Sequence, residues 1–147
     1  MSIHNPENIG DPLVSTSDDC NSVVYQGSAV VGAVLGAADV VRPCRVAGGT
    51  KVHRVTIKNP DLDTGTTLVF KAGFRAMDGT AQDSGDDQIV VAAGAATWQA
   101  AAVTVYDIFP PFLVKRDGYL EIVVGTGGTA NTGTVYAKVE GEGVGIA

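Results

Sequence analysis

The chain has 147 residues, of which 45% are hydrophobic and 18% are charged, and its formal net charge is −6. This length and composition indicate one globular domain with a real core and exclude a largely disordered chain. The acidic balance, with ten scattered Lys and Arg residues, argues against nucleic acid as a partner.

Targeting and redox features are sparse. No apolar run approaches the length of a membrane span, and the N-terminus lacks the basic and apolar regions of a secretory signal. We therefore expect a protein made in a cytoplasm, with no membrane partner. The two cysteines, Cys20 and Cys44, are predicted to be reduced thiols, since two cysteines do not make a disulfide scaffold.

Residues 1–22 contain Pro6 and Pro12 and show little periodicity. They could be a frayed terminus or an extended arm that orders on a partner. The arm hypothesis has apolar side chains to support it, which are Ile3, Ile9, Leu13 and Val14. We divide the chain into an N-terminal arm, residues 1–22, and a single domain, residues 23–147.

Residues 23–35 are rich in valine and glycine, which favours strand over helix. They predict two short strands, or one strand bent by a bulge at Gly27. Three further extended runs follow at residues 40–46, 51–59 and 67–75.

The third of these runs has the clearest period-two pattern. Its apolar positions alternate with polar or small ones, as in a strand with one wet face. The positions predicted to face the core are Leu68, Phe70, Ala72 and Phe74. We predict that the three runs form an antiparallel meander, with an edge or a bulge at Pro43, which lacks an amide hydrogen.

The middle of the chain predicts a loop over residues 76–87, a short strand over 88–91 and a helix over 92–102. The helix prediction depends on alanine, the best helix former, although Gly94 weakens it. Trp98, the only tryptophan, would then pack this helix onto the sheet.

The last third alternates again and predicts strands at residues 103–108, 119–125 and 134–140. The small residues 126–133 predict a hairpin loop, and 141–147 a glycine-rich tail. In total, about eight short strands and one short helix indicate an all-β fold, an antiparallel sandwich that is jelly-roll-like.

An apolar knot interrupts this part of the chain at residues 109–112. It consists of Phe109, Pro110, Pro111 and Phe112. It could close the core at one end of the sandwich, or it could be a contact site, because such a knot is unfavourable when fully exposed.

Catalytic and metal-binding patterns are weak. His4 and His53 have no partner at ligand spacing, so we expect no metal. Residues 61–65 and 78–87 faintly resemble calcium loops, but solvated turn acids are the simpler interpretation. The glycines of 125–128 lack a P-loop lysine, and no nucleophile–base pattern is evident. We expect neither an enzyme nor a cofactor.

The pattern of strands and turns between Gly36 and Glu140 resembles the capsid decoration, or cement, proteins of tailed bacteriophages. The segments that carry the resemblance are residues 39–46, 49–52, 61–65, 68–74 and 118–124. The resemblance implies a jelly-roll sandwich on the capsid exterior, in a virion assembled in the host cytoplasm, that stabilises the shell without catalysis. Its partner would be the major capsid protein, and closed symmetry favours a homo-oligomer, a dimer or trimer.

Capsid contacts cannot be transferred from the family, so we predict them from the apolar residues of the arm and of the knot. Two other functions stay open: a tail or head-fibre module of a phage, and a carbohydrate-binding sandwich. A carbohydrate-binding module would expose aromatic residues on one face, and this chain has few, with one Trp, four Tyr and four Phe.

Overall fold

The computed structural model describes residues 1–4, 22–80, 82, 88–129 and 132–144. This part of the chain contains nine strands, one 3-10 turn and no α-helix. The elements are β1 (Ile3–His4), β2 (Ser22–Val31), β3 (Val40–Val46), β4 (Thr50–Asn59), β5 (Val69–Ala76), β6 (Gln88–Ala95), η1 (Thr97–Gln99), β7 (Ala102–Val114), β8 (Gly118–Thr126) and β9 (Gly133–Gly143). The all-β prediction is therefore confirmed.

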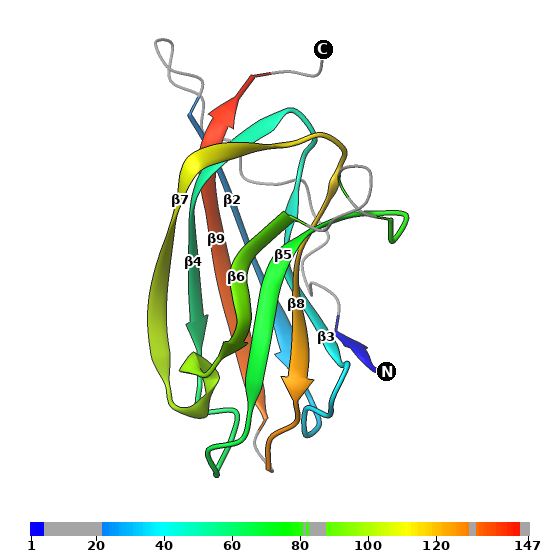
Figure 1. Cartoon of the computed structure of the whole chain (residues 1–147), viewed down its shortest axis with the longest axis vertical. Helices are drawn as coiled ribbons and strands as arrows, with labels where there is room; N and C mark the ends of the chain where they lie inside the picture. Colours follow the sequence, from blue (N-terminus) through cyan, green and yellow to red (C-terminus); the bar gives the residue numbers. More distant parts are fainter. Residues whose placement is uncertain (5–21, 81, 83–87, 130–131, 145–147) are drawn as a thin grey trace.

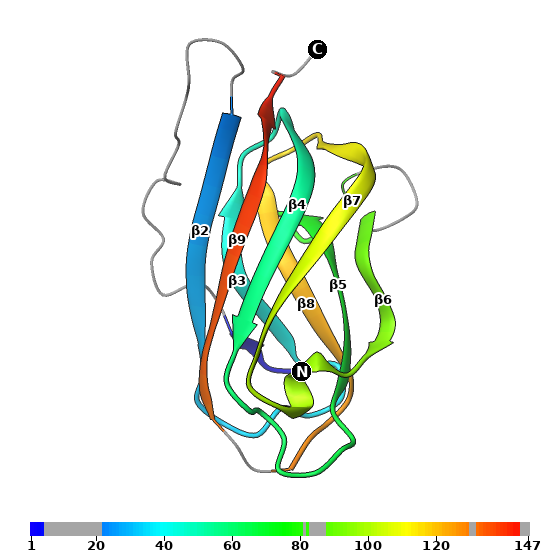
Figure 2. The same cartoon turned by 90° about the vertical axis from the view of Figure 1, so that its left-hand side faces the viewer.

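The strands form two sheets packed face to face (Figures 1 and 2). One has the order β1-β3-β8-β5-β6 and the other the order β2-β9-β4-β7. Apart from the two-residue β1, the strands pair from the outside of the sequence inward: β2 with β9, β3 with β8, β4 with β7 and β5 with β6. All four pairs are antiparallel, so the chain is one long hairpin wrapped into a jelly roll.

The predicted meander is wrong, although its three strands exist. β3 and β5 belong to the five-stranded sheet, separated by β8, whereas β4 lies in the other sheet between β9 and β7. Successive strands of a jelly roll cross from sheet to sheet. Period-two patterning shows which side of a strand is buried, but it does not show which sheet the strand joins.

The predicted inward faces are confirmed. The four alternating side chains of β5 and its approach, from Leu68 to Phe74, are buried. The same holds for the inward positions of β8 and β9, which are Leu120, Ile122, Val124, Val135, Ala137 and Val139. These side chains meet between the sheets and form one continuous core.

Two details near the start of the sandwich follow from single residues. β2 is one strand, paired with β9 without a register shift, so it has no bulge at Gly27. The bulge predicted at Pro43 is present, because the pairing of β3 with β8 shifts between Val41 and Cys44. Cys44 is a buried, free thiol, and Cys20 lies outside the described residues.

The predicted helix at 92–102 is wrong. β6 continues to Ala95, and a single 3-10 turn then leads into β7. Trp98 is fully buried in that turn and lies against Phe70, with ring centroids 4.7 Å apart. Hydrogen bonds tie the turn to its neighbours: Gln99 Nε2 donates to Leu68 O (2.9 Å), and Asn59 Nδ2 donates to Ala100 O (2.9 Å). These tertiary contacts outweigh the helix propensity of alanine.

The last third also differs from the prediction at three points. β7 runs without interruption from Ala102 to Val114, through the prolines. The loop between Thr126 and Gly133 is not a hairpin, because β8 and β9 lie in different sheets. β9 extends to Gly143, so the beginning of the predicted tail, Gly141 to Gly143, belongs to a strand.

Candidate interaction surfaces

The apolar knot lies on a bulge of β7. β4 and β7 pair regularly from Asn59–Ala102 to Arg54–Asp107, and pairing resumes only at Val52–Phe112. The backbone of residues 108–111 therefore leaves the ladder. The Phe109 side chain is 94% exposed, so it does not close the core. A phenyl ring held this far out of the protein is suited to contact with another molecule.

Its neighbours are less exposed or lie outside the description. Pro110 is exposed, Pro111 is half-buried, and the side chain of Phe112 is not among those that the structure describes. The structure thus supports an exposed apolar tip at Phe109 and Pro110. It does not support closure of the core by Phe109.

The beginning of the predicted arm lies along the five-stranded sheet. Ile3 and His4 pair in parallel with Val40 and Val41 of β3, and the Ser2 amide donates to Asp39 Oδ1 at 2.7 Å. The Ile3 side chain is exposed. The other predicted arm contacts, Ile9, Leu13 and Val14, lie outside the described residues, so the arm stays a prediction.

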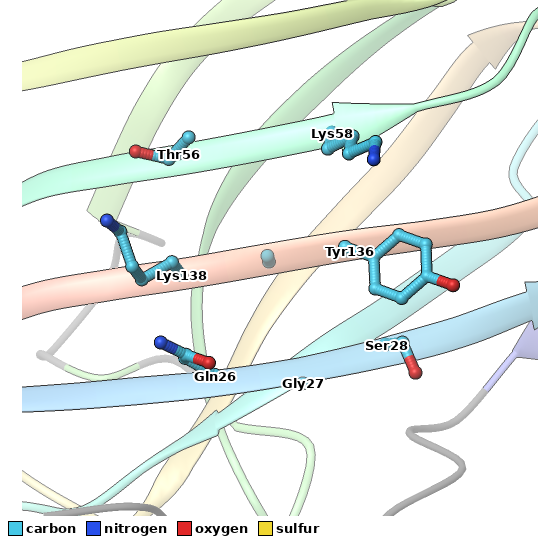
Figure 3. A pocket seen from close by; sticks show the side chains of 8 residues that line it. Gln26, Gly27, Ser28, Thr56, Lys58, Tyr136 and Lys138 are labelled. Carbon is cyan, nitrogen blue, oxygen red and sulfur yellow. The ribbon is translucent and has the colours of Figure 1, made fainter.

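The outer face of the four-stranded sheet carries a shallow depression of about 410 Å³ (Figure 3). Side chains of β2, β9 and β4 line it, among them Gln26, Ser28, Thr56, Lys58, Tyr136 and Lys138. Lys58 Nζ lies 5.8 Å from the centroid of the Tyr136 ring, a cation–π distance, and Lys138 pairs with Glu140 at 3.2 Å. The depression offers positive charge and one aromatic face but no carboxylate–histidine pair for acid–base chemistry.

The sequence gives little sign of this depression. Its residues come from every second position of three strands that are far apart along the chain. Alternation predicts that they face outward, but the neighbour relations depend on the sheet order. On the same face, Val103 and Val105 of β7 pair with Lys58 and Thr56, and they are 64% and 52% exposed.

Ion pairs organise the outer faces of both sheets. On the five-stranded sheet, Glu121 lies between two arginines, 2.9 Å from Arg42 Nη2 and 3.1 Å from Arg75 Nε. On the four-stranded sheet, Arg54 Nε donates to Asp107 Oδ1 at 2.8 Å. Glu121 is largely buried beneath its partners, so this cluster ties β3, β8 and β5 together.

The turn acids expected to be solvated are not all solvated. Asp63 is buried, and its carboxylate accepts backbone N–H bonds from Gly65, Thr67, Leu68 and Thr129 at 2.8–3.0 Å. These donors hold the pKa of Asp63 well below its usual range. With its oxygens occupied by N–H donors, Asp63 is a structural anchor for two loops rather than a cation ligand.

Asp78 matches the expectation better, because it is exposed. It accepts the Thr80 hydroxyl and amide and lies 3.3 Å from Arg116 Nη1, and these contacts lower its pKa. Residues 83–87 of the second acidic loop lie outside the described residues. His53 is exposed on β4, and the described part of the chain holds no cluster of metal-ligating side chains. Within that same part, no helix is long and apolar enough to cross a bilayer.

Comparison with known proteins shows which solved structures share this fold. Neither a protein-family model nor a curated protein matches the chain. Among solved structures, a chain of the cyanophage Pam1 capsid asymmetric unit aligns with a TM-score of 0.62 at 20% identity, covering 91% of each chain. A chain of the Ralstonia phage GP4 capsid aligns with a TM-score of 0.64 at 14% identity, covering 98% of this chain and all of that one.

The protein is thus an all-β jelly roll with the fold of chains that occur in two phage capsids. The alignments span nearly the whole of both chains, so the two matched chains are similar in length to this one. The resemblance to phage capsid proteins that the sequence indicated is confirmed for the fold.

Proposed function

We propose that the protein is a virion structural protein of a tailed bacteriophage that binds the outside of the shell of major capsid protein and stabilises it. The observation that carries this proposal is the match, over nearly the full length of both chains, to chains of two phage capsid structures. The resemblance of the sequence to capsid decoration proteins implies the same function.

The architecture is suited to a protein that binds to the surface of a larger shell. A closed sandwich with a continuous core is rigid, and its exposed apolar tip can insert into a neighbour. Many copies bound side by side on a shell reinforce it through weak contacts whose effects combine, without any single strong site. The role is structural, without catalysis or a cofactor, and the protein would act as a dimer or trimer.

We assign the shell contacts to the arm and to the knot. In the arm they are Ile3, Ile9, Leu13 and Val14. In the knot they are Phe109, Pro110, Pro111 and Phe112, of which Phe109 is the most exposed. The arm begins beside β3, so it is anchored on the five-stranded sheet before it reaches a partner.

A binding experiment on empty capsids tests the arm. The triple substitution of Ile9, Leu13 and Val14 to serine should weaken co-sedimentation at least about tenfold, because each buried aliphatic side chain contributes about 1.5–3 kcal/mol. The matched control replaces Ser15, Thr16 and Ser17 of the same segment with alanine and should bind like the wild type. Unchanged binding of the first variant would exclude the arm as the anchor.

The knot is tested in the same assay. Phe109→Ser removes the exposed ring and should reduce occupancy, whereas Met77→Ser removes an exposed apolar side chain from the loop after β5 and should not. Gold-labelled protein viewed on whole particles separates the alternatives, since a tail or head-fibre module would label the tail or single fibres instead of the whole shell.

A further inference from the structure

The four-stranded sheet ends at β7, and no described strand pairs with the outer edge of β7 (Figure 2). In such an edge strand, every second residue points its N–H and C=O away from the sheet, which invites pairing with another chain. Natural sheets prevent this with charges, prolines, bulges or a covering segment. The edges of this protein differ in how well they are protected.

Two edges carry a device of this kind. β3 is covered by β1, and the pairing of β6 with β5 is broken by two register shifts, with Gly94 in the left-handed region at φ +94°. β2, at the other end of the four-stranded sheet, has one large hydrophobic side chain that is exposed, Val30, whereas β7 has two such valines. In β7, only the second half, beyond Ile108, is protected, by the bulge and the prolines.

The first half of β7 has no such protection. From Ala102 to Asp107 it pairs with β4 without a register shift and contains no Lys, Arg or Pro. Its two valines on the outer face, Val103 and Val105, are 64% and 52% exposed. Two exposed β-branched side chains on a regular, open edge strand are typical of a strand that is paired in use.

We propose that β7 of one copy pairs antiparallel with β7 of a second copy about a two-fold axis at Thr104. A two-fold interface requires a surface that is complementary to itself. About this axis Val103 faces Val105 of the partner subunit, so both copies bury the same two side chains against each other. The two four-stranded sheets then form one continuous sheet.

The register follows from the strand limits and from charge. An axis at Thr104 uses residues 102–106 of both copies, all of which are in the strand, and it leaves Asp107 at the end, opposite Ala101. An axis at Val105 would instead place Asp107 opposite Val103 and bury a charge against an apolar side chain. At Thr104 no like charges face each other, and the Arg54–Asp107 ion pair stays intact.

Cysteine cross-linking tests this register in a Cys20→Ser background, where the one remaining native thiol, Cys44, is buried. Thr104→Cys should form a covalent dimer on mild oxidation, since directly opposed strand residues lie within disulfide range. Tyr106→Cys is the matched control on the same side of the strand. Its two copies would be about 13 Å apart, too far for a disulfide, so we expect roughly tenfold less dimer.

A mixture of two cysteine variants tests the register most directly. Copies with Ala102→Cys and copies with Tyr106→Cys should cross-link to each other but not to themselves, because these positions face each other about the proposed axis. Equal cross-linking of Thr104→Cys and Tyr106→Cys, or none at Thr104, would overturn the proposal.

A charge introduced between the two paired β7 strands provides an independent test. Val105→Lys should abolish the Thr104→Cys dimer and return the free protein to a monomer in sedimentation equilibrium. Thr134→Lys, on the outer face of β9, should leave both unchanged. Circular dichroism confirms that each variant is folded. The pairing of β7 strands is measured without capsids. A negative cross-linking result would therefore not contradict the proposed capsid binding, and a negative capsid-binding result would not contradict the pairing.

Discussion

At the residue scale, the buried carboxylate of Asp63 joins two loops. Asp63 lies between β4 and β5, and its two carboxylate oxygens accept four backbone N–H groups and the Thr129 hydroxyl. One side chain therefore fixes the loop that leads into β5 and the loop that follows β8. Those donors favour the ionised form and lower the pKa of Asp63.

The lowered pKa predicts how stability depends on pH. The unfolded chain binds a proton at Asp63 near the ordinary value of 3.8, and the folded chain does so only at lower pH. The contribution of Asp63 to folding is therefore complete above about pH 4 and decreases as the pH falls below it. We expect Asp63→Asn to lower the melting temperature at pH 7, and the difference from the wild type to shrink as the pH falls toward 2.5.

Asp61→Asn is the matched control, because Asp61 is exposed in the same turn and accepts one backbone N–H, from Asp63. Its melting temperature should stay close to that of the wild type at neutral pH. A constant difference between Asp63→Asn and the wild type at all pH values would contradict the assigned role of the carboxylate.

At the element scale, the two sheets approach each other closely at β2 and β3. A Cβ added to Gly27 would lie 2.3 Å from the Pro43 carbonyl oxygen and 3.3 Å from Cys44 Cα. These two backbones can approach only because Gly27 has no side chain. One side of the sandwich is closed by this contact between backbones.

Gly27→Ala should therefore force β2 and β3 apart. We expect it to lower the free energy of unfolding by about 1–3 kcal/mol, as for other overpacked sites, measured by urea denaturation with Trp98 fluorescence. Gly32→Ala is the control, since no atom lies within 4 Å of the added Cβ, and its unfolding free energy should change little. Equal stability of the two variants would show that β2 moves without cost.

The strands show what sequence can and cannot predict. Alternation located the strands and their buried faces, because burial of one face is a local property of the residues. It failed for residues 92–102, where alanine favours helix but bonds from Asn59 and Gln99 and the buried Trp98 impose strand, turn and strand. Those contacts come from other parts of the chain, which local propensity does not represent.

The candidate surfaces show the same limit. The apolar residue Phe109 beside two prolines left two interpretations open, closure of the core and a contact site, and its 94% exposure excludes the first for this side chain. The valines of β7 did not follow, because alternation at 103–106 gives the period but not the direction. In the structure Val103 and Val105 face solvent, while Thr104 and Tyr106 pair with the buried Ile57 and Val55. Only the sheet order decides which set faces inward.

At the scale of the whole molecule, the core is continuous between the sheets and includes the Cys44 side chain, which is fully buried. Burial raises the pKa of the Cys44 thiol from 9.0 to about 12. Thiol reagents attack the thiolate, so the folded protein protects Cys44 twice, by excluding the reagent and by keeping the thiol protonated. Labelling of this residue therefore reports how often the sandwich opens.

In a Cys20→Ser background we expect Cys44 to react with a disulfide reagent at pH 8 at least about a thousandfold more slowly than in the urea-unfolded chain. The factor follows if labelling requires global opening of a domain of ordinary stability, about 5 kcal/mol or more. Gly27→Ala, which weakens the packing beside Cys44, should accelerate labelling in proportion to its loss of stability. Gly32→Ala, where no atom lies within 4 Å of the added Cβ, should not. If all three proteins were labelled rapidly and alike, local fluctuation would expose the thiol, and the two sheets would not act as one cooperative unit.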